Sequence, residues 1–225
     1  MAAIGELSAG IAHEIRNPLA SIGSAVELLS EHFDAKDGHD ARLLNVIEKE
    51  SSRLQRISSD FLNFARIKKP DISPVNISSV IGEVLLLVEN DPRKSDTITF
   101  RNDVADDVMV LFDADQLRQL LLNLVINSLE ALGDGGGEIA LSLDTLPLPA
   151  GEYVRLVVAD TGPGFPGGEI GSVFEPFFST KPDGTGLGLA LVRKIAVGNN
   201  GRVFARNGKN GGAEVILDMK AKGDL

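Results

Sequence analysis

The sequence contains no cysteine, which excludes disulfide bonds, thiolate nucleophiles and cysteine-based zinc sites and suits a reducing compartment. No stretch approaches the roughly 20 consecutive apolar residues that a helix needs to span a bilayer. The sequence opens with the pattern of an amphipathic helix, without the charged segment and apolar core of a signal peptide. We therefore expect this part of the protein to be cytoplasmic, whereas membrane attachment of a longer protein stays open.

An excess of positive charge is also missing. The 225 residues carry a formal net charge of −10, which argues against nucleic acid as a partner, because binding its backbone requires a basic face. Almost all of the excess negative charge lies after residue 70, so the two parts of the chain differ in character. A polyanionic ligand such as ATP would depend, in the acidic part, on Mg²⁺ and backbone amides.

The first 70 residues have the pattern of two long helices. Apolar residues recur in steps of three and four, which predicts helices over about 2–32, with a bend at Pro18, and 40–68. The first apolar stripe consists of Ile4, Leu7, Ile11, Ile15, Leu19, Ile22, Val26 and Leu29, and the second of Leu43, Ile47, Leu54, Ile57, Phe61 and Phe64. Such a helical hairpin is a poor domain alone, so we expect a homodimer forming a four-helix bundle. Packing of the hairpin against the second domain is the alternative.

The pattern changes after Pro70 and Pro74, which flank a short linker. We expect helices over 78–90 (begun by serine caps), 114–132 and 187–197, and strands over 98–104 and 108–112 (around an acidic turn), 138–145, 153–159, 202–206 and 214–219. This alternation predicts an α/β sandwich with a mixed sheet. The predicted fold class is therefore α + α/β, with domains at 1–69 and 75–225 joined by the linker 70–74.

His13 lies off the apolar stripe of the first helix. Glu14 follows it at once, and Asn17 lies one helical turn further on, on the same face. A lone histidine at such a position is most often a solvated surface residue. An exposed imidazole is equally accessible to a substrate, so residues further along the chain must decide between these interpretations.

Two asparagines share one face of the apolar helix over 114–132. Asn123 and Asn127 are four residues apart, with Gln119 four residues earlier. Amides among so many leucines are costly unless they bind something, and amide oxygens suit Mg²⁺, which also takes phosphate oxygens. The alternative is that the two amides cap a neighbouring loop.

A carboxylate and two glycines follow the strand over 153–159, namely Asp160, Gly162 and Gly164. A carboxylate at a strand end can accept a hydrogen bond from the exocyclic amine of adenine, whereas guanine presents an acceptor there. The glycines allow close approach of the backbone to a flat base. The same pattern is also common in plain turns.

A second glycine cluster opens the last helix, with Gly184, Gly186 and Gly188 separated by Thr185 and Leu187. Glycines at a helix start expose backbone N–H groups to phosphate, although such a cluster is weak evidence alone. The glycine- and proline-rich segment 165–183 before it is expected to be a lid. Its phenylalanines Phe174, Phe177 and Phe178 would dock it, and Lys181 would reach the phosphates.

The order and spacing of these five features resemble the transmitter region of two-component sensor histidine kinases. The sequence from His13 to Leu19, His-Glu-Ile-Arg-Asn-Pro-Leu, carries the most specific part of the resemblance and looks most like the nitrogen-regulator and oxygen-sensor branch. Other GHKL-type ATPases share only the features from Asn123 onward. Glu130 departs from the pattern, since many relatives have a basic residue three positions after Asn127. The segment from Val197 to Gly201, Val-Gly-Asn-Asn-Gly, replaces the His-Gly pair often found after the last helix.

The resemblance implies a dimerisation and phosphotransfer hairpin followed by a Bergerat-type ATP-binding α/β sandwich. ATP and Mg²⁺ are the implied cofactors, and the receiver domain of a response regulator is the implied partner. Carried over by position, the catalytic residues are His13, Glu14 and Asn17, the nucleotide-binding residues are Asn123, Asn127, Asp160, Gly162, Gly164, Lys181, Gly184, Thr185, Gly186, Leu187 and Gly188, and the metal ligands are Asn123 and Asn127.

The predicted function is ATP-dependent autophosphorylation of His13, followed by phosphoryl transfer to an aspartate of a response regulator. Asn17 suggests an accompanying phosphatase activity toward the regulator. Two alternatives are another GHKL-type ATPase or serine kinase, and a degenerate dimeric scaffold. A sensor domain is expected upstream of this sequence, and neither its signal nor the cognate regulator can be read from these residues.

Overall fold

The computed structural model describes residues 15, 17–26, 28–29, 38–148, 151–167, 170–181, 184–209 and 211–222. The chain forms two compact units: one contains residues 1–66 with 176–187, and the other contains residues 67–175 with 188–225. We call them the helical unit and the α/β unit and describe each by itself. The predicted domain bounds, 1–69 and 75–225, stay a prediction.

The helical unit contains α2 (Gly38–Ala65) and, before it, helical residues between 15 and 29. On α2, Ile57 and Phe64 of the predicted apolar stripe are buried. The first stripe is only partly buried within the chain, because Leu29 is buried whereas Leu19 and Val26 are about half exposed (53% and 50%). Among the described residues, no helix has the length and apolar character needed to cross a bilayer.

The α/β unit contains a five-stranded mixed sheet in the order β2-β4-β5-β7-β6 and a two-stranded sheet of β1 and β3. The strands are β1 (Ser73–Asn76), β2 (Ile98–Asp103), β3 (Met109–Phe112), β4 (Gly137–Leu148), β5 (Gly151–Asp160), β6 (Arg202–Asn207) and β7 (Ala213–Lys220). Only β2 and β4 run parallel, and the other pairs are antiparallel. The predicted mixed sheet is therefore confirmed.

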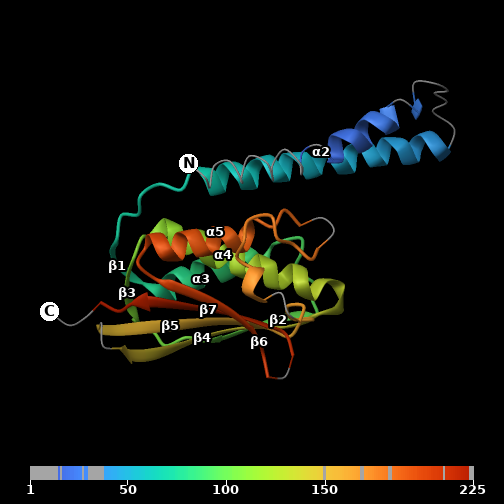
Figure 1. The fold of residues 1–225 in the computed structure, drawn as a ribbon. Coiled ribbons are helices and arrows are strands. Elements are labelled where there is room, and N and C mark those ends of the chain that lie inside the picture. The colour runs from blue at the N-terminus through green and yellow to red at the C-terminus, as the bar shows by residue number, and fades with distance from the viewer. Residues whose placement is uncertain are drawn as a thin grey trace. The chain divides into compact units, whose positions relative to one another are not determined.

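Three helices cover one face of the large sheet: α3 (Ile77–Glu89), α4 (Ala114–Leu132) and α5 (Gly188–Gly198) (Figure 1). The predicted limits of α4 match the structure because both ends carry local signals. Asp113 accepts a hydrogen bond from the Gln116 amide at the start, and Gly133 ends the helix with a φ of 50°. The apolar side chains between them include several that are completely buried, such as Leu117, Leu120, Leu121 and Leu124.

The structure differs from expectation around β1. Ser73 and Pro74, expected in the linker, lie in β1, where proline is tolerated because β1 pairs on one side only, with β3. The next helix is capped by Asn76, whose side-chain oxygen accepts from the Ser79 amide, and not by serine. The strands β2 and β3, predicted on either side of an acidic turn, belong to different sheets.

A buried polar network fixes residues 68–71 to the α/β unit. Gln116 donates its side-chain N–H to the Lys68 carbonyl at 3.0 Å, and Asn199 donates to the Gln116 side-chain oxygen at 2.8 Å. The amide of Asp71 donates to the Asp113 carboxylate at 2.9 Å. Asn199 is only 2% exposed and Gln116 8%, so water competes little for the bond between their side chains, whereas the Asp71–Asp113 bond is exposed. The segment before β1 therefore belongs structurally to the α/β unit.

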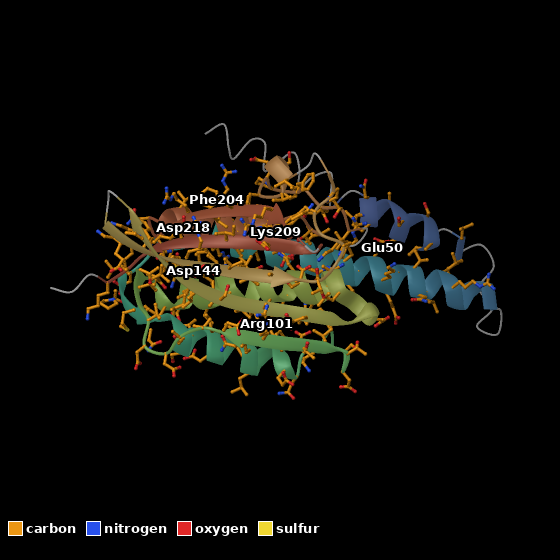
Figure 2. All side chains as sticks on the ribbon, turned by 90° about the horizontal axis from the view of Figure 1, so that it is seen from below. Glu50, Arg101, Asp144, Phe204, Lys209 and Asp218 are labelled. Carbon is orange, nitrogen blue, oxygen red and sulfur yellow. The ribbon has the colours of Figure 1, made fainter. Side chains whose placement is uncertain are left out.

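The other face of the large sheet carries charged side chains (Figure 2). Asp144, Arg155, Asp218 and Arg202 lie opposite one another on four neighbouring strands. Arg155 binds the buried Asp218 carboxylate through two nitrogens, at 2.7 and 2.9 Å. This bidentate pair offsets the cost of burying a carboxylate on the sheet.

Candidate nucleotide-binding site

The two asparagines of α4 lie at the start of α5. The side-chain N–H of Asn123 donates to the Gln119 carbonyl, one turn earlier, at 2.8 Å. A Cβ atom on Gly188 would lie 3.5 Å from the Asn123 side-chain oxygen and 3.5 Å from the Asn127 side-chain nitrogen. The structure thus brings together three residues of the predicted site. The bond of its amide nitrogen to Gln119 turns the Asn123 oxygen toward Gly188, and this oxygen is the atom that suits Mg²⁺.

Asp160 is the last residue of β5, and its carboxylate is 8% exposed. Its Oδ1 accepts hydrogen bonds from the amides of Gly162, at 2.9 Å, and Ala213, at 3.2 Å. Its Oδ2 accepts from the hydroxyl of Ser128, on α4, at 3.3 Å. These bonds hold the carboxylate in one orientation and leave part of the capacity of Oδ2 unused.

The first glycine cluster packs tightly around this carboxylate. A Cβ atom on Gly162 would lie 2.9 Å from Asp160 Oδ1 and 3.5 Å from the Ala131 methyl of α4. Gly164 has a φ of 76°, and the next residue, Phe165, exchanges two hydrogen bonds with the Asn207 side chain at 2.7 and 2.9 Å. The glycines are therefore needed for close packing and for a left-handed turn.

The second glycine cluster, apart from Gly188, lies in the helical unit. Gly186 has a φ of 65°, its carbonyl accepts from the Phe177 amide at 3.0 Å, and a Cβ atom there would overlap the Phe177 backbone. The Thr185 hydroxyl donates to Asp60 of α2 at 2.7 Å. Leu187 is buried, with 1% exposed.

The turn before this cluster is closed by backbone and hydroxyl contacts. The Gly184 amide donates to the Lys181 carbonyl at 3.1 Å, and the Lys181 amide donates to the Ser179 hydroxyl at 3.2 Å. A Cβ atom on Gly184 would collide with that hydroxyl. These contacts involve the Lys181 backbone, so the reach of its ammonium group to phosphate stays a prediction.

The predicted catalytic residues are only partly described. His13 and Glu14 lie outside the described residues, so their roles stay predictions. Asn17 is described, and it is helical and exposed. An exposed amide in this position is available to a partner molecule.

Three residues around the site were missed in the sequence. Ser128 and Asn207 give no local signal, because their partners Asp160 and Phe165 lie 32 and 42 residues away along the chain.

Arg93 is the third, and its guanidinium pairs with Glu130 at 3.5 Å and with Asp91 at 2.7 Å. The hydrogen bond from Arg93 lowers the pKa of Asp91 below its usual value. A cation from the turn before β2 thus lies beside Glu130, the position at which the sequence departs from the pattern of many relatives.

Two family descriptions match the chain. Residues 3–70 match the His Kinase A (phospho-acceptor) domain, and residues 112–223 match the histidine kinase-, DNA gyrase B-, and HSP90-like ATPase. The first range contains His13, and the second contains the glycine clusters and both asparagines of α4.

Curated relatives match nearly the whole chain. The sensor histidine kinase ZraS of Klebsiella oxytoca is 36% identical over 224 residues, which cover 99% of this chain and 47% of that protein. The sensory histidine kinase/phosphatase NtrB of Rhodobacter capsulatus is 37% identical over 211 residues, covering 85% of this chain and 55% of that protein. The chain therefore spans about half the length of the curated relatives it matches.

Solved structures show the same similarity. The catalytic domain of histidine kinase ThkA is 33% identical, with a TM-score of 0.58, and the match covers 67% of this chain and 95% of that one. ThkA in complex with the response regulator protein TrrA is 31% identical, with a TM-score of 0.77, and the match covers 99% of this chain and 63% of that one.

Proposed function

The chain belongs to the sensor histidine kinase family and comprises its transmitter region, and on this premise we propose that it phosphorylates its own His13 with ATP and passes the phosphoryl group to an aspartate of a response regulator. The relatives that carry these names are about twice as long as this chain. The activity, the substrates and the partners are therefore assigned here as a proposal.

The observation that carries the proposal is the arrangement of polar groups along α4. Asn123 and Asn127 lie at Gly188, and the next residue, Ser128, contacts the carboxylate of Asp160. One helix thus carries groups suited to both ends of a nucleotide. The phosphates would lie near the asparagines and the α5 start, and the exocyclic amine of adenine would donate to Asp160.

The donor set at Asn123 and Asn127 fits Mg²⁺. The two amides lie around the same glycine, and Asn123 has its N–H engaged and its oxygen available. When bound there with ATP, Mg²⁺ would offset the negative charge that develops on the phosphates during transfer. The chain's own asparagines would position the triphosphate relative to the backbone amides at the start of α5.

His13 is assigned as the nucleophile. One ring nitrogen of the neutral imidazole attacks the γ-phosphorus, the new N–P bond forms as the bond to the β-phosphate oxygen breaks, and ADP leaves. Glu14 accepts a hydrogen bond from the other ring nitrogen, which fixes the tautomer and stabilises the imidazolium. In the second reaction a carboxylate oxygen of the regulator attacks the same phosphorus, and the imidazole leaves.

The radiolabelling experiment uses ATP that carries the label on its γ-phosphate. The chain should acquire a label that is lost in acid and stable in base, as expected of a phosphorus–nitrogen bond. His13→Gln should remove the label and keep ATP affinity, whereas Asn127→Ala should lose Mg²⁺-dependent ATP binding. Label that persists in the His13 variant contradicts the assignment of His13, and an acid-stable label indicates a serine kinase.

The remaining alternatives have distinct outcomes in the same experiment. ATP hydrolysis without any label on the protein indicates a GHKL-type ATPase. Neither label nor ATP binding indicates a degenerate scaffold. The match of residues 3–70 to a phospho-acceptor domain favours the kinase over both.

A phosphatase activity toward the regulator is supported by Asn17. This residue is exposed and helical and follows His13 by four positions in the sequence, and the relative NtrB is named a kinase/phosphatase. The Asn17 amide would orient a water molecule toward the aspartyl phosphate of the regulator. Asn17→Ala should lose phosphatase activity and keep autophosphorylation, and an equal loss of both would indicate a structural role.

A homodimer is the proposed assembly. Leu19, Val26 and Leu28 are each about half exposed in the single chain, as is Leu44 on α2. A second hairpin would cover such apolar side chains in a four-helix bundle. Sedimentation of the chain should give twice the monomer mass of 23.9 kDa, and a monomer at micromolar concentration contradicts the bundle.

A further inference from the structure

The hydrogen bonds of Asp160 account for three of its four acceptor positions. A carboxylate has about four lone-pair directions, two on each oxygen. The amides of Gly162 and Ala213 occupy those of Oδ1, and the Ser128 hydroxyl occupies one on Oδ2. One direction on Oδ2 is therefore left for a ligand.

Ser128 is the only one of these three donors that belongs to a side chain. The two amides belong to the backbone next to Asp160 and at the start of β7, so a change of side chain, other than to proline, does not remove them. Ser128 is 6% exposed and Asp160 is 8% exposed, so water competes little for their bond. A serine within a helix can instead bond the carbonyl one turn earlier, but in this structure its hydroxyl lies 3.3 Å from Asp160 Oδ2.

The position of Ser128 on α4 gives this bond a further consequence. Ser128 directly follows Asn127, which lies at Gly188 at the start of α5. A hydrogen bond from Ser128 to Asp160 therefore ties the carboxylate to the same helical turn that carries the phosphate-side amide. The register of one helix then sets the distance between the two ends of the nucleotide site.

We propose that Ser128 is a positioning residue for purine selectivity: its hydroxyl fixes the rotation of the Asp160 carboxylate, so that Oδ2 offers one acceptor direction to the exocyclic amine of adenine. The inference rests on the proposed ATP site, in which Asp160 binds the base. Without the hydroxyl, both acceptor directions of Oδ2 are unoccupied, and the carboxylate is held only through the hydrogen bonds to Oδ1. The geometry that favours an amine over a carbonyl oxygen at this position of the purine is then weakened.

The test compares the dissociation constants of ATP and inosine triphosphate, both with Mg²⁺, measured by calorimetry on the whole chain. The two ligands differ at position 6 of the purine, where inosine has a carbonyl oxygen in place of the amine proposed to bind Asp160, and at the adjacent N1, which carries a hydrogen only in inosine. Ser128→Ala should weaken ATP about fivefold and leave inosine triphosphate nearly unchanged, so that the ratio of the two constants falls about fivefold. Ser128→Thr, which keeps a hydroxyl, should restore much of the ratio.

Ser142→Ala is the matched control, because it removes a serine hydroxyl far from the proposed role. Ser142 lies on β4 next to the buried Leu141, and neighbouring side chains of a strand point to opposite faces, so Ser142 lies on the face away from the helices. It should leave both constants unchanged. Thermal unfolding without nucleotide reports whether each variant folds.

Two outcomes for Ser128→Ala overturn the proposal. An unchanged ratio means that the hydroxyl does not position the carboxylate for the base. If Ser128→Ala weakens the binding of both ligands equally, the ratio of the two constants is again unchanged, and the loss of affinity indicates a general effect on the fold. If the unmodified chain binds the two triphosphates equally, base recognition by Asp160 fails, and the role of Ser128 falls with it. If the unmodified chain prefers ATP to inosine triphosphate and the Ser128 variants keep the same ratio of constants, the role of Ser128 is contradicted and the proposed function is not.

Discussion

The two glycine clusters look alike in the sequence and differ in what requires their glycines. Around Asp160 the cluster is enclosed by polar groups of the α/β unit, with Gly162 against a carboxylate and Gly164 beside Asn207. In the second cluster, Gly184 and Gly186 pack against the preceding loop, where Gly186 lies against the Phe177 backbone, and only Gly188 lies at the asparagines of α4.

This difference agrees with the proposed role of the first cluster in base binding, whereas Gly184 and Gly186 of the second cluster close a loop. In the first, side chains from α4 and β6 determine the geometry. In the second, backbone contacts within residues 177–186 do so, together with one hydroxyl bond to Asp60. Four substitutions, ordered by expected effect, test whether the clusters differ in this way.

Gly186→Ala should have the largest effect. Alanine disfavours a φ of 65°, and its Cβ would lie 2.7 Å from the Phe177 Cα atom, so the loop must move. Because Gly188 follows two residues later, we expect a loss of ATP affinity of about 100-fold. Calorimetry measures it, with Gly171→Ala as control, since that position has open space. An affinity within threefold of the unmodified chain contradicts the backbone requirement.

Asp160→Asn should change the preferred purine. The amides of Gly162 and Ala213 would hold the asparagine oxygen at the position of Oδ1, which places its NH₂ group at the position of Oδ2. A donor there suits a carbonyl oxygen, so ATP should weaken about 30-fold and inosine triphosphate should bind more tightly than before. Competition between the two triphosphates measures the change. Equal weakening of both would show that the first cluster does not contact the base.

Asn207→Ala should loosen the first cluster alone. It removes two hydrogen bonds to Phe165, and these are worth about 1–2 kcal/mol together. We expect faster hydrogen exchange at the Phe165 amide by about tenfold, with no change at the Phe177 amide, which bonds within the second cluster. Faster exchange at both amides would mean that the clusters are not independent.

Thr185→Val should have the smallest effect. The change removes the hydroxyl that donates to Asp60 and keeps the branched shape of the side chain. The partly exposed carboxylate can bond water instead, so a loss of about 0.5–1 kcal/mol is expected. Limited proteolysis between residues 176 and 187 should become about threefold faster. Ser179→Ala provides a comparison within the same turn, and unchanged proteolysis in the Thr185 variant would exclude a contribution of this bond.

Elements with local signals were predicted well. The limits of α4 coincide with prediction because its cap at Asp113 and its stop at Gly133 adjoin the helix in sequence. The strand β1 was missed, since four residues containing Pro74 form a strand only by pairing with β3, about 35 residues away. The parallel pairing of β2 with β4 was likewise hidden, because partners in such a sheet are set by tertiary contacts.

The residues that bind in the proposed site divide in the same way. Asn123, Asn127, Asp160 and the glycines could be picked from spacing and order, because a helical turn or a strand end places them without reference to the rest of the chain. Ser128 and Asn207, which support the site, could not, because each becomes relevant only through a partner far away in sequence.

The helical and α/β architectures, the apolar faces and the chemical groups proposed to bind a nucleotide can be predicted from residue patterns, because periodicity and capping act over a few residues. The surroundings of the two glycine clusters depend instead on contacts between distant parts of the chain. Gly162 and Gly186 cannot be told apart by residue type, and only the atoms that approach them in the fold differ: the Asp160 carboxylate lies against Gly162, whereas the Phe177 backbone lies against Gly186.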